Sequence, residues 1–447
     1  MEKAVSKPGA RGDMVVWTVA AAATLVASIG VIGADALWLV PLGDRIAHGH
    51  LPGSIFFASG PTGGWHDVPA AAELLFWAAY HSLGGDRGVV VAQAAAAAIG
   101  FGALAWGLRR DASSGTVATV SVVVLAGSLP AVAVAGVSLF SLALFPVLLA
   151  LVEAESRAPS RRVWLAVPLL AVWGNLHGGA LVGLGLLACY LVFSRARLQG
   201  WIAVGVLAAS AAVLCLTPAL WRTPLYYKGV FDSEPAQSGE GLWKPLGFGG
   251  FGLLLIAAAV TLAVCALARG PREIPVWEAV AALGLTAATV HVARNGVFLL
   301  LVLAYPAARG LRLREIPRRW LVSATLALGA LALLLVVRGP LDPGSQSLAR
   351  MAAASREPVL AGAVLGQQVV LAGGRIWVGN PIDAFRRSDQ RLYLDWLEGL
   401  PSGELAVSRA HYVLVDPGSA AGRYAANDRR LKLVVVSPGA ALYRVTT

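Results

Sequence analysis

Charged side chains are scarce in this sequence. Asp, Glu, Lys and Arg make up 14% of the 447 residues, whereas hydrophobic residues make up 57%. A soluble domain carries roughly 25% charged residues. The deficit falls in long runs of Ala, Val, Leu and Gly, which is the composition of helices that face lipid. The sequence therefore predicts an integral membrane protein rather than a set of soluble domains.

Several functional signals are also missing. The three cysteines, Cys189, Cys215 and Cys265, lie in apolar runs without the spacing of metal ligands. The sequence has no Gly-rich loop of the P-loop type. Despite a formal net charge of +11, it has no basic stripe with interleaved aromatic residues. We therefore expect neither a cysteine metal site nor nucleic acid as a partner.

The positive charge is instead explained by topology, because Lys and Arg collect in the cytoplasmic loops of multi-pass membrane proteins. The first apolar run, 14–34, is long enough to span and lacks a clear cleavage site, so we expect a retained span. Basic loops alternate with apolar runs, which predicts about eleven membrane-embedded helices in the plasma (inner) membrane. The N-terminus is expected in the cytoplasm and the C-terminal region outside. The basic segments behind this prediction are 3–11, 109–110, 157–162, 195–197, 269–272 and 309–319.

Residues 1–337 are predicted to form an all-α polytopic membrane bundle. A first external loop, 35–87, is rich in Gly, Pro, His, Trp and Asp, and a second external loop covers 218–248. Within the first loop, residues 70–83 are expected to form a helix near the membrane interface.

Residues 338–447 differ in character from the bundle. Short β-like runs surround a helical stretch at 390–398, which predicts a small extracytoplasmic α/β domain. The β-like runs are 359–360, 368–371, 375–378, 412–415 and 431–436.

Two apolar stretches are expected to form pairs of short helices. The stretch 163–193 is longer than one ordinary span and is broken at 174–179 by Gly-Asn-Leu-His-Gly-Gly. The stretch 276–308 is interrupted at 292–295 by Val-Ala-Arg-Asn. Irregular backbone at membrane depth is tolerated only where protein or water covers it. The polar break at 174–179 should therefore face a cavity that opens to the outer side.

Polar side chains near membrane depth are candidates for function. Asp35 ends the first span and could accept a proton from an attacking hydroxyl or hold a divalent metal. Alternatively, it is a helix-end aspartate solvated at the interface. His66, Asp67 and Glu73 could bind sugar hydroxyls or assist a base. Alternatively, Asp67 caps the helix that follows.

The breaks in the apolar stretches carry further candidates. Asn175 and His177 could line the expected cavity, or they could only satisfy backbone groups that the break frees. Arg294 lies between apolar helices and needs an anion, and a phosphate suits its planar guanidinium. Alternatively, Arg294 only marks a loop. We expect Asp35 and Arg294 to lie at a similar depth near the outer face.

The order of these features resembles the GT-C superfamily of membrane glycosyltransferases, and more closely a group of bacterial GT-C-like proteins. Their first loop opens with Asp-x-Asp-x-Trp-Trp-His, and here Asp35 falls on the second Asp and Trp38 on the second Trp. The most specific match is Trp-Gly-Asn-Leu-His-Gly-Gly at 173–179. The remaining matches are Gly43, Ile46, Trp65, Asp67, Glu73-Leu74-Leu75-Phe76 and the segment 377–385.

The resemblance implies a GT-C-like enzyme that moves a sugar from polyprenyl phosphate to an envelope glycan, lipid or protein at the outer face. Asp35 would be the general base, and Arg294 with His177 would stabilise the departing lipid phosphate. Gly33 and Leu39 stand where the pattern has Asp and His, which argues against a metal at Asp35. No other cofactor is assigned. The other residues expected to bind the donor are Asn175, His66, Asp67 and Glu73.

Two other classes of protein stay open. The departures at Gly33 and Leu39 are compatible with a catalytically inactive GT-C-like scaffold that binds glycolipid. Broken helices at membrane depth also occur in transporters and flippases, although no internal repeat relates the two halves of this sequence. Activity on a sugar-lipid would separate the enzyme from the scaffold, and substrate counterflow in liposomes would identify a transporter.

Overall fold

The computed structural model describes residues 10–62, 64–268, 270–338 and 345–446. The chain divides into two compact units. The first, here called the bundle unit, comprises Met1–Val31, Val90–Leu216 and Leu242–Gly339. The second, here called the α/β unit, comprises Ile32–Val89, Thr217–Gly241 and Pro340–Thr447. The two loops that were predicted as parts of a membrane domain 1–337 thus belong to the same compact unit as the C-terminal region.

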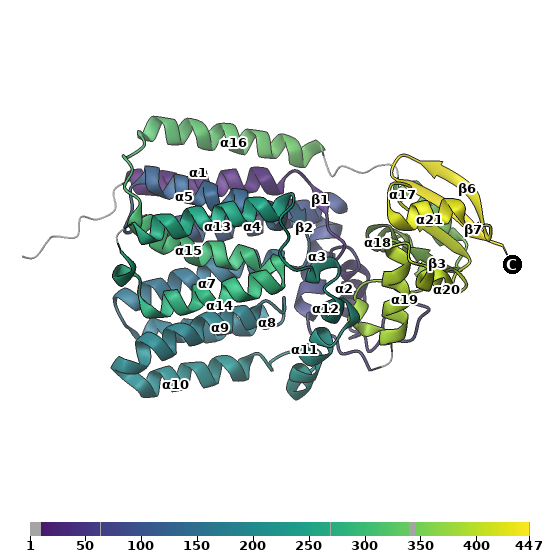
Figure 1. The fold of residues 1–447 in the computed structure, drawn as a ribbon, viewed down its shortest axis with the longest axis horizontal. Coiled ribbons are helices and arrows are strands. Elements are labelled where there is room, and N and C mark those ends of the chain that lie inside the picture. The colour runs from purple at the N-terminus through teal and green to yellow at the C-terminus, as the bar shows by residue number, and fades with distance from the viewer. Residues whose placement is uncertain (1–9, 63, 269, 339–344, 447) are drawn as a thin grey trace, which may run out of the picture. The chain divides into compact units, whose positions relative to one another are not determined.

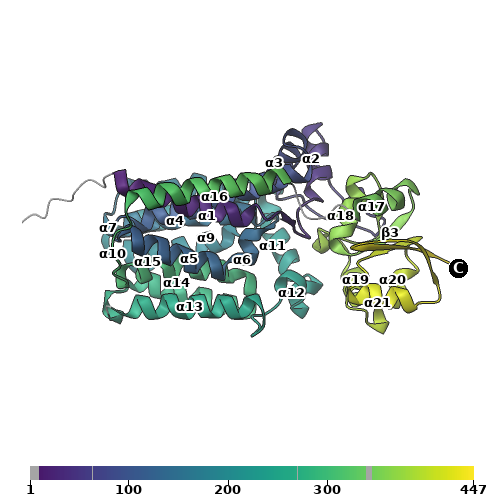
Figure 2. The ribbon, with the colours of Figure 1, turned by 90° about the horizontal axis from the view of Figure 1, so that it is seen from above.

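Long apolar helices build the bundle unit, where they run side by side (Figures 1 and 2). Within it, α1 packs on α16, and α13 packs on α15. The helices are α1 Ala10–Ala27, α4 Asp86–Leu108, α5 Ser114–Gly127, α6 Leu129–Ala133, α7 Leu139–Arg157, α8 Ala166–Gly174, α9 Ala180–Tyr190, α10 Ala196–Val213, α13 Phe251–Leu267, α14 Val276–His291, α15 Gly296–Gly310 and α16 Arg318–Arg338. Two-residue strands also occur, β1 Val31–Ile32 and β2 Val134–Ala135.

The predicted membrane character is supported by the length and composition of these helices. Four helical stretches in the described part of the chain are long and apolar enough to cross a bilayer, namely Asp86–Leu108, Leu139–Arg157, Ala180–Val213 and Arg318–Arg338. Other apolar helices, including Ser114–Gly127 and Phe251–Leu267, are shorter. The predicted number of about eleven embedded helices is therefore not confirmed. The orientation in the membrane also stays a prediction.

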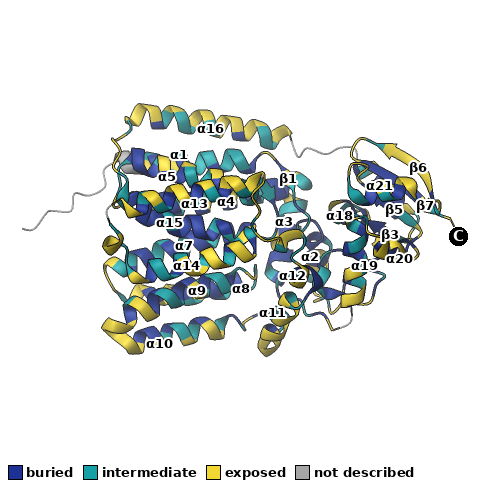
Figure 3. Cartoon of the chain, in the orientation of Figure 1, coloured by how far each residue is buried: buried dark blue, intermediate teal, exposed yellow. Residues whose placement is uncertain are grey.

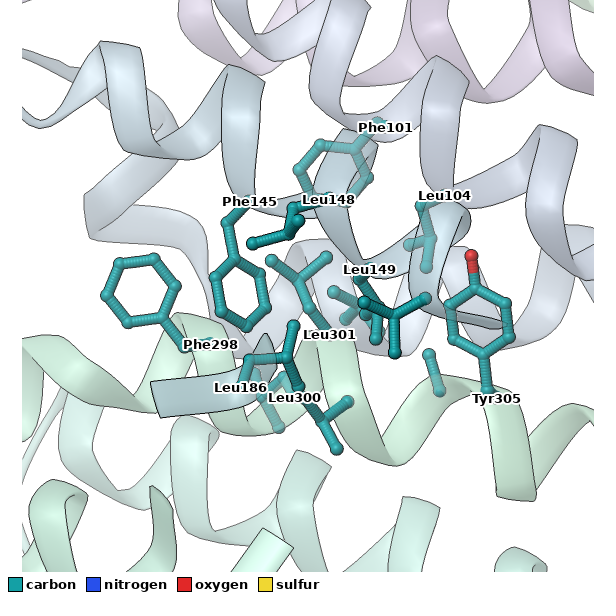
Figure 4. Close-up of a cluster of buried hydrophobic side chains, with 14 of the residues drawn as sticks. Phe101, Leu104, Phe145, Leu148, Leu149, Leu186, Phe298, Leu300, Leu301 and Tyr305 are labelled. Carbon is teal, nitrogen blue, oxygen red and sulfur yellow. The ribbon is translucent and has the colours of Figure 1, made fainter. Parts of the chain in front are cut away.

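An aromatic and aliphatic core holds the bundle unit together. The rings of Phe145 and Phe298 lie 4.7 Å apart between centroids, and Phe101 and Tyr305 are buried in the same cluster (Figure 4). By contrast, α16 leaves most of its apolar residues exposed (Figure 3). An apolar helix that is exposed on most sides is suited to contact lipid rather than water.

Both predicted breaks in the apolar stretches are present. The first helix ends at Gly174 and the second begins at Ala180, and the later pair is joined by a 3-10 turn, Ala293–Asn295. A π-helical turn, Leu191–Arg195, continues α9 into α10, and Gln199 interrupts the helix with φ −148° and ψ 74°. The chain reverses there, because α10 packs back on α8 and α9.

A five-stranded sheet lies in the α/β unit, with the order β4-β3-β5-β7-β6. The pairs β3–β4 and β3–β5 are parallel, whereas β5–β7 and β6–β7 are antiparallel. The strands are β3 Pro358–Ala361, β4 Arg375–Ile376, β5 Tyr412–Val415, β6 Leu431–Ser437 and β7 Ala440–Val445. The helices of this unit are α2 Leu39–Ala47, α3 Ala70–Ser82, α11 Thr223–Phe231, α12 Glu234–Ser238, α17 Ser345–Ala354, α18 Ala363–Leu371, α19 Arg387–Leu397, α20 Glu404–Val407 and α21 Ala420–Asn427.

The α/β prediction for the C-terminal region is correct in outline and wrong in one element. Helix α19 and strand β5 match the predicted stretches 390–398 and 412–415, and in the first external loop helix α3 matches the predicted stretch 70–83. The run 368–371, predicted as a strand, instead ends helix α18. A short apolar run does not distinguish a strand from a buried turn of helix, and here the helix packs on β3 and β4.

The first external loop extends this sheet beyond β4. The Ile376 N–H donates to the carbonyl of Phe57 at 3.0 Å, and the Ile376 carbonyl accepts from the Ser59 N–H at 2.8 Å. The Gly60 N–H donates to the carbonyl of Trp377 at 3.0 Å. Because the loop supplies these hydrogen bonds, the short strand β4 is not left as an open sheet edge.

Candidate functional site

The predicted site residues fall in both units. Asn175, His177 and Arg294 lie in the bundle unit. The residues Asp35, His66, Asp67 and Glu73 lie in the α/β unit. The expectation that Asp35 and Arg294 share one cavity stays a prediction.

His177 is held by a short chain of hydrogen bonds at the break between α8 and α9. Its Nδ1 lies 2.5 Å from the Ser141 Oγ and accepts from the Gly179 N–H at 3.3 Å. Trp173 Nε1 donates to the same Ser141 Oγ at 2.9 Å. Because Nδ1 accepts the backbone N–H, the proton of the neutral imidazole belongs on Nε2. The Ser141 hydroxyl then donates to Nδ1, and His177 keeps Nε2–H as a donor.

Asn175 takes a backbone role in this structure. Its Nδ2 donates to the carbonyl of Ala171 at 2.9 Å and to that of Leu216 at 2.6 Å. Carbonyls at the end of a helix have no intrahelical partner, so this side chain closes α8 and joins it to the segment after α10. The geometry thus favours the alternative interpretation of Asn175, and its contact with a donor stays a prediction.

Arg294 lies near His177 and stacks on an aromatic ring. Its guanidinium carbon is 4.2 Å from the centroid of the Trp243 ring, and its charge acts on the His177 imidazole. Two backbone bonds hold the Trp243 segment against the 292–295 turn, from Ala293 N–H to the Lys244 carbonyl at 2.9 Å and from Leu246 N–H to the Val290 carbonyl at 3.1 Å. The ring fixes the plane of the guanidinium, and the planar set of N–H groups is the feature by which arginine binds oxyanions.

Gly179 is required for the His177 arrangement, which gives a first prediction. A Cβ at this position would lie 2.3 Å from the Ser141 Oγ and 2.9 Å from the His177 Nδ1. We expect Gly179→Ala to break the Ser141–His177 hydrogen bond and to cost about 1–3 kcal/mol in the free energy of unfolding. Thermal unfolding and the ¹⁵N shifts of the His177 ring would measure this. The control Gly185→Ala, where nothing lies within 4 Å, should not destabilise the protein; equal losses in both variants would contradict the prediction.

In the α/β unit, the turn that carries Asp35 is fastened by two side chains from the C-terminal region. Gln367 Oε1 accepts from the Leu37 N–H at 2.6 Å, and its Nε2 donates to the Gly33 carbonyl at 3.3 Å. Asn380 Nδ2 donates to the Ala34 carbonyl. We call Gln367 and Asn380 the clamp residues. They fix the backbone on both sides of Asp35, which is half-buried.

Asp67 and Glu73 form a buried pair of carboxyl groups. Glu73 has no exposed surface, and the two carboxyl groups interact through a side-chain hydrogen bond with each other, while no other described residue donates to them. Burial raises the pKa of Asp67 to about 6 and that of Glu73 well above its ordinary value, where the Asp67 charge adds to the effect. The prediction that Asp67 could cap the next helix is wrong, because α3 begins after Pro69 without a side-chain cap. His66 beside the pair is half-buried.

Tyr226 and Asp383, which were not among the predicted site residues, lie near this pair. The pKa of Tyr226 is raised by burial and then by the charges of Asp383, Tyr227, Asp67 and Glu73. Burial also raises the pKa of Asp383 to about 6. The pair therefore lies where the first loop, α11 and the C-terminal region meet. Among the described residues, no three His, Cys, Asp or Glu side chains come together as a metal site would need.

The Asp67 carboxyl predicts a pH-dependent stability. Its pKa is about 6 in the folded protein and 3.8 ordinarily, so the folded state binds this proton more tightly than the unfolded state does. The free energy of unfolding should therefore fall as the pH rises from about 4 to above 6, by an amount on the order of 3 kcal/mol.

Thermal unfolding at pH 4 and pH 8 would test this. Asp67→Asn should raise the unfolding temperature at pH 8 and change it little at pH 4. Asp44→Asn, at an exposed residue of the same loop, controls for the loss of one negative charge. A pH dependence that is identical in Asp67→Asn and the unmodified protein would exclude Asp67 as its source.

The comparisons with known proteins concern the fold. No protein-family model matches the sequence, and no curated protein matches it. One similar solved structure is a cryo-EM structure of a mutant of the arabinofuranosyltransferase AftD from mycobacteria, with a TM-score of 0.51 and 16% sequence identity. The match covers 96% of this chain and 41% of that chain. The chain therefore spans less than half the length of this neighbour, and the likeness supports a GT-C-like fold.

Proposed function

We propose that this chain is a membrane glycosyltransferase. It moves a sugar from a polyprenyl-phosphate donor to an envelope glycan, lipid or protein acceptor at the outer face of the plasma membrane. The fold likeness to a membrane glycosyltransferase supports the class of reaction. The observation that carries the proposal is that the charge of Arg294, which stacks on Trp243, acts on His177, because a cation and an N–H donor in the same region of the bundle unit suit a phosphate.

In the proposed reaction, the acceptor hydroxyl oxygen attacks the anomeric carbon of the sugar. The bond from that carbon to the phosphate oxygen breaks, and its electron pair leaves with the lipid phosphate. Asp35 takes the hydroxyl proton as general base. Arg294 and His177 Nε2–H stabilise the negative charge that grows on the leaving phosphate.

The remaining predicted residues suit the sugar rather than the phosphate. Apart from the hydrogen bond between them, the carboxyl groups of Asp67 and Glu73 receive no donor in the described part of the protein, and sugar hydroxyls are such donors. Half-buried His66 is adjacent in sequence. Asn175 is proposed to keep the break open beside His177, through its bonds to the carbonyls of Ala171 and Leu216.

The test is transfer by the purified protein in proteoliposomes. A panel of polyprenyl-phosphate pentoses and hexoses would be offered with envelope glycan fragments, and release of free polyprenyl phosphate would be measured. Acceptor-dependent release with at least one donor is the expected result. Binding of a donor without release would instead support the inactive scaffold. Gly33 and Leu39, which stand where the family pattern has Asp and His, are compatible with that alternative. Counterflow of the donor across the bilayer would support a transporter.

Arg294 gives a prediction that does not require the acceptor. We expect Arg294→Ala to weaken donor-lipid binding by about 2 kcal/mol, because a desolvated phosphate loses its charge-assisted hydrogen bonds. Arg294→Lys should recover only part of the loss, since lysine cannot bind a phosphate with two parallel bonds. Binding would be measured by native mass spectrometry. Arg312→Ala, at an exposed arginine of the bundle unit, is the control and should bind normally.

A further inference from the structure

The second external loop presents an unusual surface in the segment from Leu220 to Phe231, which comprises a 3-10 turn and α11. Its apolar residues are turned outward: Trp221 is 78% exposed and Leu225 is 64% exposed. Leu220 and Phe231 are also exposed. A water-soluble surface would not collect four large apolar residues in twelve positions of one loop.

The helix α11 has two distinct faces. Thr223, Tyr226, Tyr227 and Val230 lie on one face and are buried or half-buried. Leu225, Lys228 and Phe231 lie on the other face and are exposed. This division follows the helical repeat, so it belongs to the helix and not to scattered surface residues.

The backbone before α11 is shaped to present this surface. Leu220 has a φ of +48°, a conformation that a bulky residue rarely adopts. The turn is held by a hydrogen bond between the Thr217 and Thr223 hydroxyls at 2.7 Å and by the Thr223 hydroxyl donating to the Leu220 carbonyl at 2.7 Å. A glycine would adopt this φ without strain. The sequence instead has a leucine here, which strains the backbone and exposes an apolar side chain.

We propose that the exposed face of Leu220–Phe231 binds the surface of the lipid bilayer. Two observations favour this occupant. Helix α10 ends at Val213 after packing along α8 and α9 in the apolar bundle, and residues 214–219 alone separate this end from the segment, which therefore begins close to the end of a bundle helix. The segment also combines exposed Trp221 with exposed Arg222 and Lys228, the pairing of aromatic and basic residues found at membrane interfaces.

This surface has a consequence for the buried carboxyl pair. Tyr226, on the opposite face of α11, interacts electrostatically with Asp67, Glu73 and Asp383. A helix bound to lipid on one face keeps its other face in a fixed position. Lipid binding by Trp221 and Leu225 thus fixes the tyrosine beside the carboxyl pair, whether or not the protein is an enzyme.

The test places a fluorescent label on each of two leucines with matched exposure. Leu225→Cys and Leu405→Cys, the latter 63% exposed in α20, would be labelled with NBD in a background where the three native cysteines are Ala. Each protein would be reconstituted into nanodiscs that contain phosphatidylglycerol. The label at 225 should be about twofold brighter than the label at 405 in the same nanodiscs and be quenched by lipids with a shallow nitroxide, as insertion at the headgroup level requires. The label at 405 should show neither change.

Each other outcome overturns the proposal. Equal behaviour of the two labels would show that Leu225 is free in water. Protection of the 225 label from iodide without quenching by nitroxide lipids would show that protein covers it, either a second copy or another part of the chain. Trp221→Glu in the labelled protein should reduce the lipid quenching by at least half. Thermal unfolding of each variant would confirm that the fold is retained.

Discussion

Asp35→Asn is expected to abolish sugar transfer while it leaves donor-lipid binding unchanged. The amide has nearly the same shape as the carboxylate, but it cannot accept the proton of the attacking hydroxyl. Removal of a general base costs about 10²–10⁴-fold in rate, and we expect a loss of at least about 10³-fold because no other described carboxylate is placed in this turn. The clamp bonds to the turn use backbone groups, so the substitution should not disturb them.

The measurement is the initial rate of polyprenyl-phosphate release together with donor binding by native mass spectrometry. Asp44→Asn is the matched control, because its oxygen can still accept from Trp77 Nε1, which lies 3.1 Å away. Normal transfer by Asp35→Asn would remove Asp35 from the mechanism. If the variant lost donor binding as well as transfer, Asp35 would have a role in binding the donor rather than in proton transfer.

The membrane bundle could be predicted from the sequence because each of its signals is local. Apolar runs, basic loops and the Gly-Asn-Leu-His-Gly-Gly break each depend on neighbouring residues, and the break at 174–179 is present in the structure. The run 368–371 shows the limit of this reasoning. Its apolar residues suit a strand or a buried helix equally, and only packing against β3 and β4 decides between them.

The supporting residues of the candidate site could not be predicted in the same way. Gln367 reaches the backbone of Leu37 across 330 positions of sequence, and a single glutamine in a helix carries no local sign of such a contact. Ser141 and Trp243 likewise act on His177 and Arg294 from distant segments. The polar residues that stood out in the sequence were those in unusual local settings, whereas their partners occupy ordinary ones.

The sequence of segment 377–385 matches the family pattern but predicts no chemical role for it. In the structure, the Trp377 carbonyl accepts a hydrogen bond from the Gly60 N–H, and the Asn380 side chain donates to the Ala34 carbonyl. Asp383 in the same segment acts on Tyr226. The segment therefore joins the first external loop to α11 within the α/β unit.

Removal of both clamp residues should have the second large effect on transfer. In the double variant Gln367→Ala/Asn380→Ala, the backbone carbonyls of Gly33 and Ala34 and the Leu37 N–H lose their side-chain partners. The Asp35 turn would then sample several conformations. Because a misplacement of about 1 Å can cost 10²-fold in rate, we expect kcat to fall by about 100- to 1000-fold with little change in KM for the donor.

Hydrogen exchange of the peptide that contains residues 33–38 provides a readout that does not depend on catalysis. It should quicken in the double variant, since the Leu37 N–H loses its acceptor at 2.6 Å. Asn427→Ala is the control, because Asn427 donates within its own helix, to the Arg423 carbonyl at 2.8 Å. Gln367→Glu keeps the acceptor for Leu37 but loses the donor to Gly33, so its exchange should be intermediate. Faster exchange with normal transfer would show that the clamp residues hold the turn but that the position of the Asp35 carboxylate does not limit transfer. Unchanged exchange would show that the clamp residues do not hold the turn.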